Sequence, residues 1–256
     1  MIFTGAELTA FVGSFLWPLF RVSAIVMTAP VFGAKTVPAR VKLIISLAIT
    51  SVIVPMLPAT MPEVEVFSLQ GLYVTVNQIL IGIAIGFTTQ LVFSAIIMAG
   101  QIVAMQMGLG FSLMVDPQNG TQAPVMSQFY IIFVLLVYLS LNGHLVLVQI
   151  MIDSFTTLPV ALTGLSTESI WGIVSWASYI FSGAIGIAIP AIASLLVVNL
   201  SFGIMTRAAP QLNIFAIGFP VTMMLGFALV LLTLSNVAPK SNELFLNVYQ
   251  LIRGFH

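Results

Sequence analysis

Cysteine is absent from the 256-residue chain, and charged residues are scarce. The lack of cysteine excludes disulfide bonds and thiolate chemistry and leaves the redox compartment undefined. Charged residues make up 5% of the chain, whereas an ordinary soluble domain has roughly a quarter. Seven basic and seven acidic residues cancel, so the net charge gives no indication of a nucleic-acid partner. Together with 60% hydrophobic residues, this scarcity predicts that membrane lipid surrounds much of the chain.

Long charge-free runs predict membrane-spanning helices. Residues 66–115, 169–206 and 208–239 contain no charged residue, and a helix of about 20 apolar residues crosses a bilayer. These runs lack the period-2 alternation of barrel strands, and backbone groups in hydrocarbon must pair within their own segment. We therefore expect an all-α polytopic membrane protein of about six long apolar helices, partly kinked and arranged as hairpins. The expected segments are residues 8–30, 41–57, 69–99, 125–152, 170–205 and 213–236.

Arg21 lies inside the first apolar segment. Only Glu7 precedes it among the charged residues, so the segment lacks the basic lead of a signal sequence and is expected to remain as a helix. An unpaired cation within a bilayer costs about 2.5–3.5 kcal/mol on insertion scales. Arg21 should therefore pair with a carboxylate or carbonyl group, or reach an interface. A structural role and a place in a polar pathway both stay open, and a neighbouring subunit could supply the counterion.

Recognisable catalytic and metal-binding patterns are missing. The sequence has no HExxH pair, GxSxG elbow, P-loop or cluster of histidine and acid at ligand spacing. His144 is nine residues from the nearest acid, Asp153, so we favour a structural hydrogen bond over a proton relay. We expect neither an enzyme nor a cofactor. The rival hypothesis is a secondary transporter of a small solute, for which Arg21 and His144 would have to form a polar site near the midplane.

Small residues recur four positions apart in two of the expected helices. This spacing stacks them on one helix face and lets two helix backbones approach closely. Such faces serve packing within a chain or packing against another subunit, and the sequence leaves both open. The positions concerned are Gly82, Gly86, Ser178, Ser182 and Gly186.

The most informative segment reads MQMGLGFSLMVDPQNGTQAP, residues 105–124. Its glycines disfavour a continuous helix, while methionine and phenylalanine are apolar fillers. Irregular backbone at membrane depth is tolerated only inside protein or against an aqueous cavity. At that depth the segment could close a pore by dewetting. The alternative is an ordinary connecting loop, which so many turn-forming residues also favour.

Six stretches of the sequence form a recognisable set, namely FLWPLFRVSAIVMTAP (15–30), VPARVKL (37–43), QILIGIAIGF (78–87), GQIVAMQMGLGFSLMVDP (100–117), NGHLVL (142–147) and RAAPQLNIFAIGFP (207–220). Together they resemble the FliR family of flagellar protein-export subunits. They occur in the family's order over nearly the whole chain, and the RAAPQLN stretch favours the flagellar branch over the related virulence injectisome subunit.

The resemblance implies a subunit of the export gate in the bacterial inner membrane, at the flagellar basal body. Such a subunit assembles with FliP and FliQ into a helical channel for unfolded flagellar proteins, with FlhB around its entrance. It also implies a FliP-like part, residues 1–165, followed by a FliQ-like hairpin and tail, residues 166–256.

In the family, the loop that matches residues 105–122 forms a plug in the closed channel. Relatives can carry phenylalanine at the position of Met114, so the methionine here predicts a softer seal. Arg21 and Arg207 match family positions within or beside the membrane. The implied plug residues are Met105, Met107, Gly108, Gly110, Phe111 and Met114.

Overall fold

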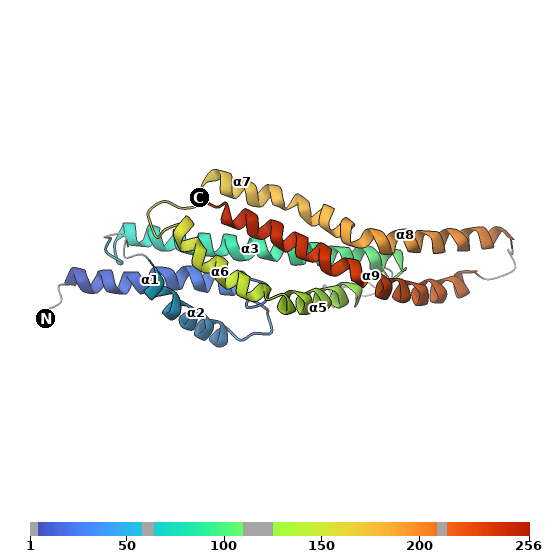
Figure 1. The fold of residues 1–256 in the computed structure, drawn as a ribbon, viewed down its shortest axis with the longest axis horizontal. Coiled ribbons are helices and arrows are strands. Elements are labelled where there is room, and N and C mark those ends of the chain that lie inside the picture. The colour runs from blue at the N-terminus through green and yellow to red at the C-terminus, as the bar shows by residue number, and fades with distance from the viewer. Residues whose placement is uncertain (1–4, 58–63, 110–124, 209–213) are drawn as a thin grey trace. The chain divides into compact units, whose positions relative to one another are not determined.

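A computed structural model of the chain describes residues 5–57, 64–109, 125–208 and 214–256 (Figure 1). Helices dominate these ranges, which contain no strand, so the all-α prediction is confirmed. The elements are α1 (Gly5–Thr28), α2 (Ala39–Ile53), the 3-10 turn η1 (Val54–Met56), α3 (Leu69–Gln106), α5 (Val125–Ser140), α6 (Gly143–Thr157), α7 (Thr167–Trp176), α8 (Ser178–Ala208) and α9 (Ile214–Arg253).

Length and composition allow most of these helices to cross a bilayer. Four described stretches are long and apolar enough, namely Ala39–Met56, Leu69–Gln106, Thr167–Ala208 and Gly218–Arg253. Helices α5 and α6 together form a fifth candidate span that is bent by 68°. The shorter apolar helix Val12–Thr28 lies within α1. Each of the six expected segments thus corresponds to a helix or a pair of helices, as in a polytopic membrane protein.

The helices differ from the expected segments at several places, one of which is Ala177, where the fifth segment divides into α7 and α8. Helix α3 continues to Gln106, beyond the expected end at residue 99. Helix α9 runs past Asn236 and through Pro239 to Arg253. The fourth segment is interrupted at Asn142, whose φ of 57° is left-handed. A left-handed residue cannot continue a right-handed helix, so this one residue separates α5 from α6.

Two compact units can be distinguished and are described separately. The first consists of Met1–Leu91, Asn142–Trp176 and Leu246–His256. The start of α7 is joined to His256, three residues beyond the end of α9. The Ser166 amide donates to the His256 carbonyl oxygen at 2.8 Å, and the Ser169 hydroxyl donates to it at 3.1 Å. Helices α1, α3 and α6 supply its buried apolar core, including Trp17, Val22, Ile25, Ile81, Ile85, Leu147 and Ile150.

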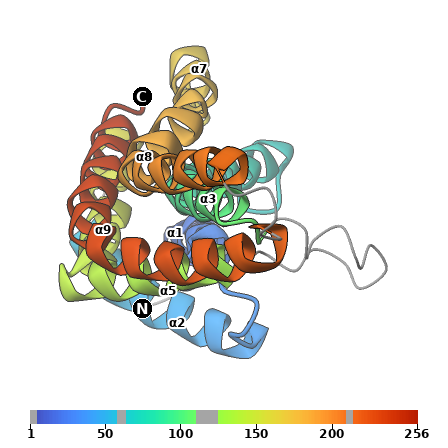
Figure 2. The same ribbon diagram turned by 90° about the vertical axis from the view of Figure 1, so that its right-hand side faces the viewer.

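The second unit consists of Val92–Leu141 and Ala177–Phe245. Helices α8 and α9 form a long hairpin in it (Figures 1 and 2). Three aromatic rings, those of Phe93, Tyr138 and Phe245, join α3, α5 and α9, with ring centroids 4.7–6.0 Å apart. Both units draw residues from each side of position 165, so they do not test the division into a FliP-like and a FliQ-like part, which stays a prediction.

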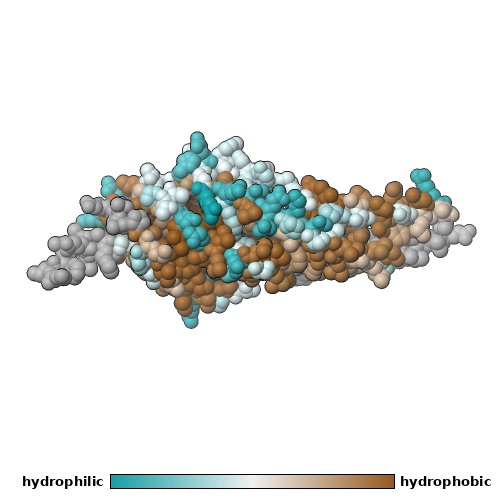
Figure 3. Space-filling model, viewed as in Figure 1, coloured by the Kyte–Doolittle hydropathy of each residue, from teal (hydrophilic) through white to brown (hydrophobic). Residues whose placement is uncertain are grey.

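Large apolar side chains remain exposed on several helices. Ile44 and Val52 of α2 are 63% and 67% exposed, and Leu232 of α9 is 74% exposed. Hydrophobic residues cover much of the molecular face in Figure 3, including the surface of the α8–α9 hairpin. Extensive exposed apolar surface marks contact with membrane or with other proteins, and the apolar helices match the membrane protein expected from composition.

Candidate functional site

The end of α3 is a defined helix stop at Gly108. The Leu109 amide donates to the Ala104 carbonyl oxygen at 2.9 Å, and the Gly108 amide donates to the Met105 carbonyl oxygen at 3.1 Å. Gly108 has a φ of +81°, which a residue without Cβ adopts at little cost. These features form a Schellman motif. The expectation that glycine ends the helix in this segment is therefore confirmed at Gly108, whereas Met105 still belongs to α3.

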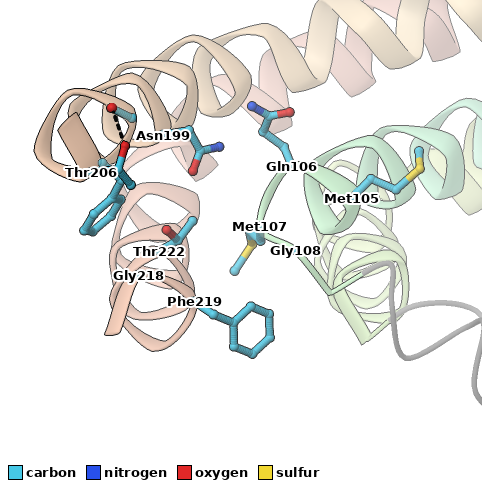
Figure 4. Close-up of a pocket in the computed structure, with 11 residues that line it drawn as sticks. Met105, Gln106, Met107, Gly108, Asn199, Thr206, Gly218, Phe219 and Thr222 are labelled. Atoms are coloured by element: carbon cyan, nitrogen blue, oxygen red, sulfur yellow. Dashed lines mark hydrogen bonds between the residues drawn. The ribbon is translucent and has the colours of Figure 1, made fainter. Parts of the chain in front are cut away.

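Residues of α9 contact Met107 and Gly108 at the end of α3. Met107 is completely buried. A Cβ atom placed on Gly226 of α9 would lie 2.7 Å from Cε and 2.8 Å from Cγ of Met107, so the side chain occupies the space that glycine leaves open. A Cβ on Gly108 would lie 3.1 Å from the ring of Phe219, also on α9. Met107 points toward the α9 residues in Figure 4, while Met105 points away from them and is exposed.

A cavity of about 420 Å³ lies beside this contact (Figure 4). Its lining is uncharged, which leaves it without an ionic or acid–base group. Thr206 is tied to its own helix, since its hydroxyl donates to the Gly203 carbonyl oxygen at 2.7 Å. The lining can therefore accommodate apolar or neutral polar groups. It comprises Met105, Gln106, Met107 and Gly108 from the end of α3, Asn199, Phe202, Gly203 and Thr206 from α8, and Gly218, Phe219 and Thr222 from α9.

Arg21 is fully buried in the first unit and contacts neutral groups. Its Nε donates to Gln78 Oε1 at 2.8 Å, and a terminal nitrogen donates to the same oxygen. Its other terminal nitrogen donates to the Ser154 carbonyl oxygen at 2.7 Å. The guanidinium carbon lies 4.3 Å from the centroid of the Phe155 ring. The expected pairing with a carbonyl group is found, and it ties α1 to α3 and α6.

No relay between His144 and Asp153 is found among the described contacts. Asp153 Oδ1 accepts a hydrogen bond from Gln149 Nε2 at 2.7 Å. The buried Nδ1 of His144 has no hydrogen-bond partner in the part of the chain that the structure describes. The structural hydrogen bond expected for this histidine is therefore not observed at Nδ1.

The two sets of small residues lie in different surroundings. A Cβ on Gly82 would lie 2.6 Å from the Ala24 Cβ, and one on Gly86 would lie 2.8 Å from the Thr28 Cβ. These glycines therefore let α3 pack closely on α1. In the second unit, Ser178 and Ser182 are exposed, and a Cβ on Gly186 would meet no described atom within 4 Å.

The remaining expected site residues are only partly described. Arg207 lies in the last turn of α8 and is exposed. Gly110, Phe111 and Met114 lie outside the described residues.

Several residues that contact the expected site residues were not singled out from the sequence. Gly226 and Phe219 contact the end of α3 from more than 100 positions away in the chain, and Gln78 and Ser154 bind Arg21. A glycine within an apolar helix and a glutamine before an apolar run are weak signals. Their partners become identifiable only when the helices are packed together.

Comparison with known proteins covers nearly the whole chain. The sequence matches the family described as bacterial export proteins, family 1, over residues 12–248. It is 40% identical over 249 residues to the flagellar biosynthetic protein FliR of Escherichia coli (strain K12), which covers 97% of this chain and 95% of that protein. FliR of Bacillus subtilis (strain 168) is 30% identical over 227 residues, covering 87% and 86%. FliR of Aquifex aeolicus (strain VF5) is 27% identical over 245 residues, covering 96% and 94%. The chain therefore belongs to the FliR family of flagellar biosynthesis and export proteins.

Proposed function

We propose that this protein is a non-enzymatic core subunit of the flagellar type III export gate. It forms, with FliP and FliQ, the channel through which unfolded flagellar proteins cross the bacterial inner membrane at the basal body, and FlhB lies around the entrance. FliR family membership over nearly the whole chain supports this assignment. Exposed apolar faces on α2, α8 and α9 support membership of an assembly within lipid. Residues 1–165 act as the FliP-like part and residues 166–256 as the FliQ-like part.

In this proposal, residues 105–122 form a plug that closes the channel at rest. The observation that carries the proposal is the helix stop at Gly108. It ends a 38-residue apolar helix and turns the chain into a segment of apolar and small residues. An apolar constriction blocks hydrated ions by dewetting. Phe111 and Met114 supply the bulk of this constriction, and the glycines around Phe111 let the segment deform when a substrate passes.

Replacing Phe111 and Met114 together with glycine tests the plug. Cells that carry this variant should become more permeable to ions and small solutes, because the constriction loses two large apolar side chains. The measurement is dye or ion influx, taken at matched levels of assembled complex. The control replaces both residues with leucine, which keeps their apolar volume and should leave the influx low. An unchanged leak in a correctly assembled glycine variant would contradict the plug.

A further inference from the structure

We propose that α9 positions the plug through a socket made by Gly226 and Phe219, which holds Met107 and Gly108 at the end of α3. This inference rests on the proposed function, since it assigns the residues that fix where the plug begins. All of these contacts lie within the second unit, and the structure describes all four residues. Gly226 and Phe219 are positioning residues in this scheme, because they act through the residues at the start of the plug.

The contact between Met107 and Gly226 restrains more than the tip of a flexible side chain. A Cβ on Gly226 would approach Cγ of Met107 as well as Cε. Rotation about the last bond of methionine moves Cε but leaves Cγ in place. A larger residue at position 226 would therefore have to displace Met107 at Cγ as well as at its tip.

Phe219 restrains the backbone at the next residue. The Phe219 ring lies close to Gly108, with its Cε2 and Cδ2 at 3.1 and 3.2 Å from the point where a Cβ on Gly108 would lie. The left-handed φ of Gly108 sets the direction in which the chain leaves the helix. Met107 thus fixes the position of the helix end and Gly108 fixes the exit direction. Both are held by residues of one helix, seven positions apart.

The neighbouring cavity gives a displaced Met107 somewhere to move. About 420 Å³ of space lies beside the socket, more than a methionine side chain needs. A methyl group added at Gly226 should therefore shift the helix end and still allow the chain to fold. Gly203 provides a matched control, because it lines the same cavity and a Cβ there meets no described atom within 4 Å.

Disulfide formation tests the contact itself. The natural chain has no cysteine, so a Met107→Cys, Gly226→Cys pair would hold the only two thiols of this subunit. In the assembled complex in membranes, mild oxidation should link this pair, and it should not link the control pair Met107→Cys, Gly203→Cys. Failure of the first pair to form a disulfide would overturn the socket.

Ion leak tests the positioning role. Gly226→Ala should raise the resting leak of cells on the order of tenfold, because overpacking of this size shifts a two-state equilibrium by about one decade. Gly203→Ala should leave the leak unchanged. In the Met107→Ala background, Gly226→Ala should add nothing further, since the clash has lost its second partner. Additive effects of the two substitutions would overturn the coupling.

Failure of the socket can be told apart from failure of the proposed function. If the Phe111 and Met114 glycine variant leaks and Gly226→Ala does not, the plug stands and its positioning by α9 is wrong. If neither variant leaks in assembled complexes, the plug itself is wrong and the positioning role falls with it. Leak from both variants, with a disulfide at Met107 and Gly226, is the result that the socket requires.

Discussion

Arg21 is a buried cation in an apolar helix, and its charge is stabilised by contacts within the chain. A buried cation needs several good acceptors, and here an amide oxygen and a backbone carbonyl oxygen supply them. The contact with the Phe155 ring adds attraction between the cation and the electron-rich face of the ring. These interactions give the arginine a structural role in joining three helices, the first of the two roles that the sequence left open.

Replacing Arg21 with alanine should be far more damaging than the same change at Arg207. The first substitution leaves Gln78 Oε1 buried without its donor, and the Ser154 carbonyl oxygen keeps only the Leu158 amide as a donor. It should lower the stability of the assembled complex by about 3 kcal/mol. Arg207 is exposed, and exposed substitutions usually change stability by less than about 0.5 kcal/mol. Thermal unfolding midpoints of the two purified variants measure the difference. Equal midpoints would show that the buried contacts contribute little.

Small residues four positions apart occur in both α3 and α8, but their surroundings differ. Gly82 and Gly86 place their open sides against α1. Along α8, the stripe formed by Ser178, Ser182 and Gly186 is largely exposed in this chain. The four-residue spacing is common to both, so spacing alone predicts close approach without identifying the partner.

Alanine at Gly86 and at Gly186 should therefore have different consequences. Gly86→Ala forces a clash with Thr28 and with the backbone nitrogen of Ala29, and such overpacking costs about 1–3 kcal/mol. It should reduce the amount of folded chain. Gly186→Ala should leave the chain's own folding intact, because alanine favours a helix and its Cβ would meet no described atom within 4 Å.

The two variants also test whether the α8 stripe packs on another subunit. For that role, Gly186→Ala should reduce copurification of other gate proteins while the chain itself stays folded. Folded chain is measured by resistance to proteolysis in membranes, and assembly is measured by pull-down. Full assembly of the Gly186 variant would indicate that the α8 stripe faces lipid.

At the scale of the whole molecule, the need for different neighbouring subunits separates a gate subunit from a solute transporter. A transporter should be stable alone or as a homo-oligomer, whereas a gate subunit requires different neighbours. The tagged chain, extracted from bacterial membranes in mild detergent, should therefore retain other small membrane proteins at a fixed ratio. Native mass spectrometry of the purified material measures that ratio. A homogeneous homo-oligomer would instead support the transporter.

The sequence determined those features of the fold that depend on neighbours along the chain. Apolar runs divided by proline, glycine and charged residues predicted the six apolar segments, because hydrocarbon selects apolar side chains and internally paired backbone wherever a helix crosses it. Gly108 was predicted to disfavour helix, since its conformational freedom is a property of the residue itself. The left-handed residue Asn142 was missed as a break. Asn142 and Gly143 form a turn signal, but they lie within a run of apolar residues that is long enough for one membrane-spanning helix.

Tertiary structure alone decided which residues meet. Gln78 and Ser154 reach Arg21 across 57 and 133 positions of sequence, and Gly226 receives Met107 from a distant helix. Apolar helices of similar composition can pack in many ways, because lipid gives little preference for one apolar face over another. The choice among these packings depends on small residues, on shape and on a few polar contacts. The partner of each such residue is known only when the helices are placed side by side.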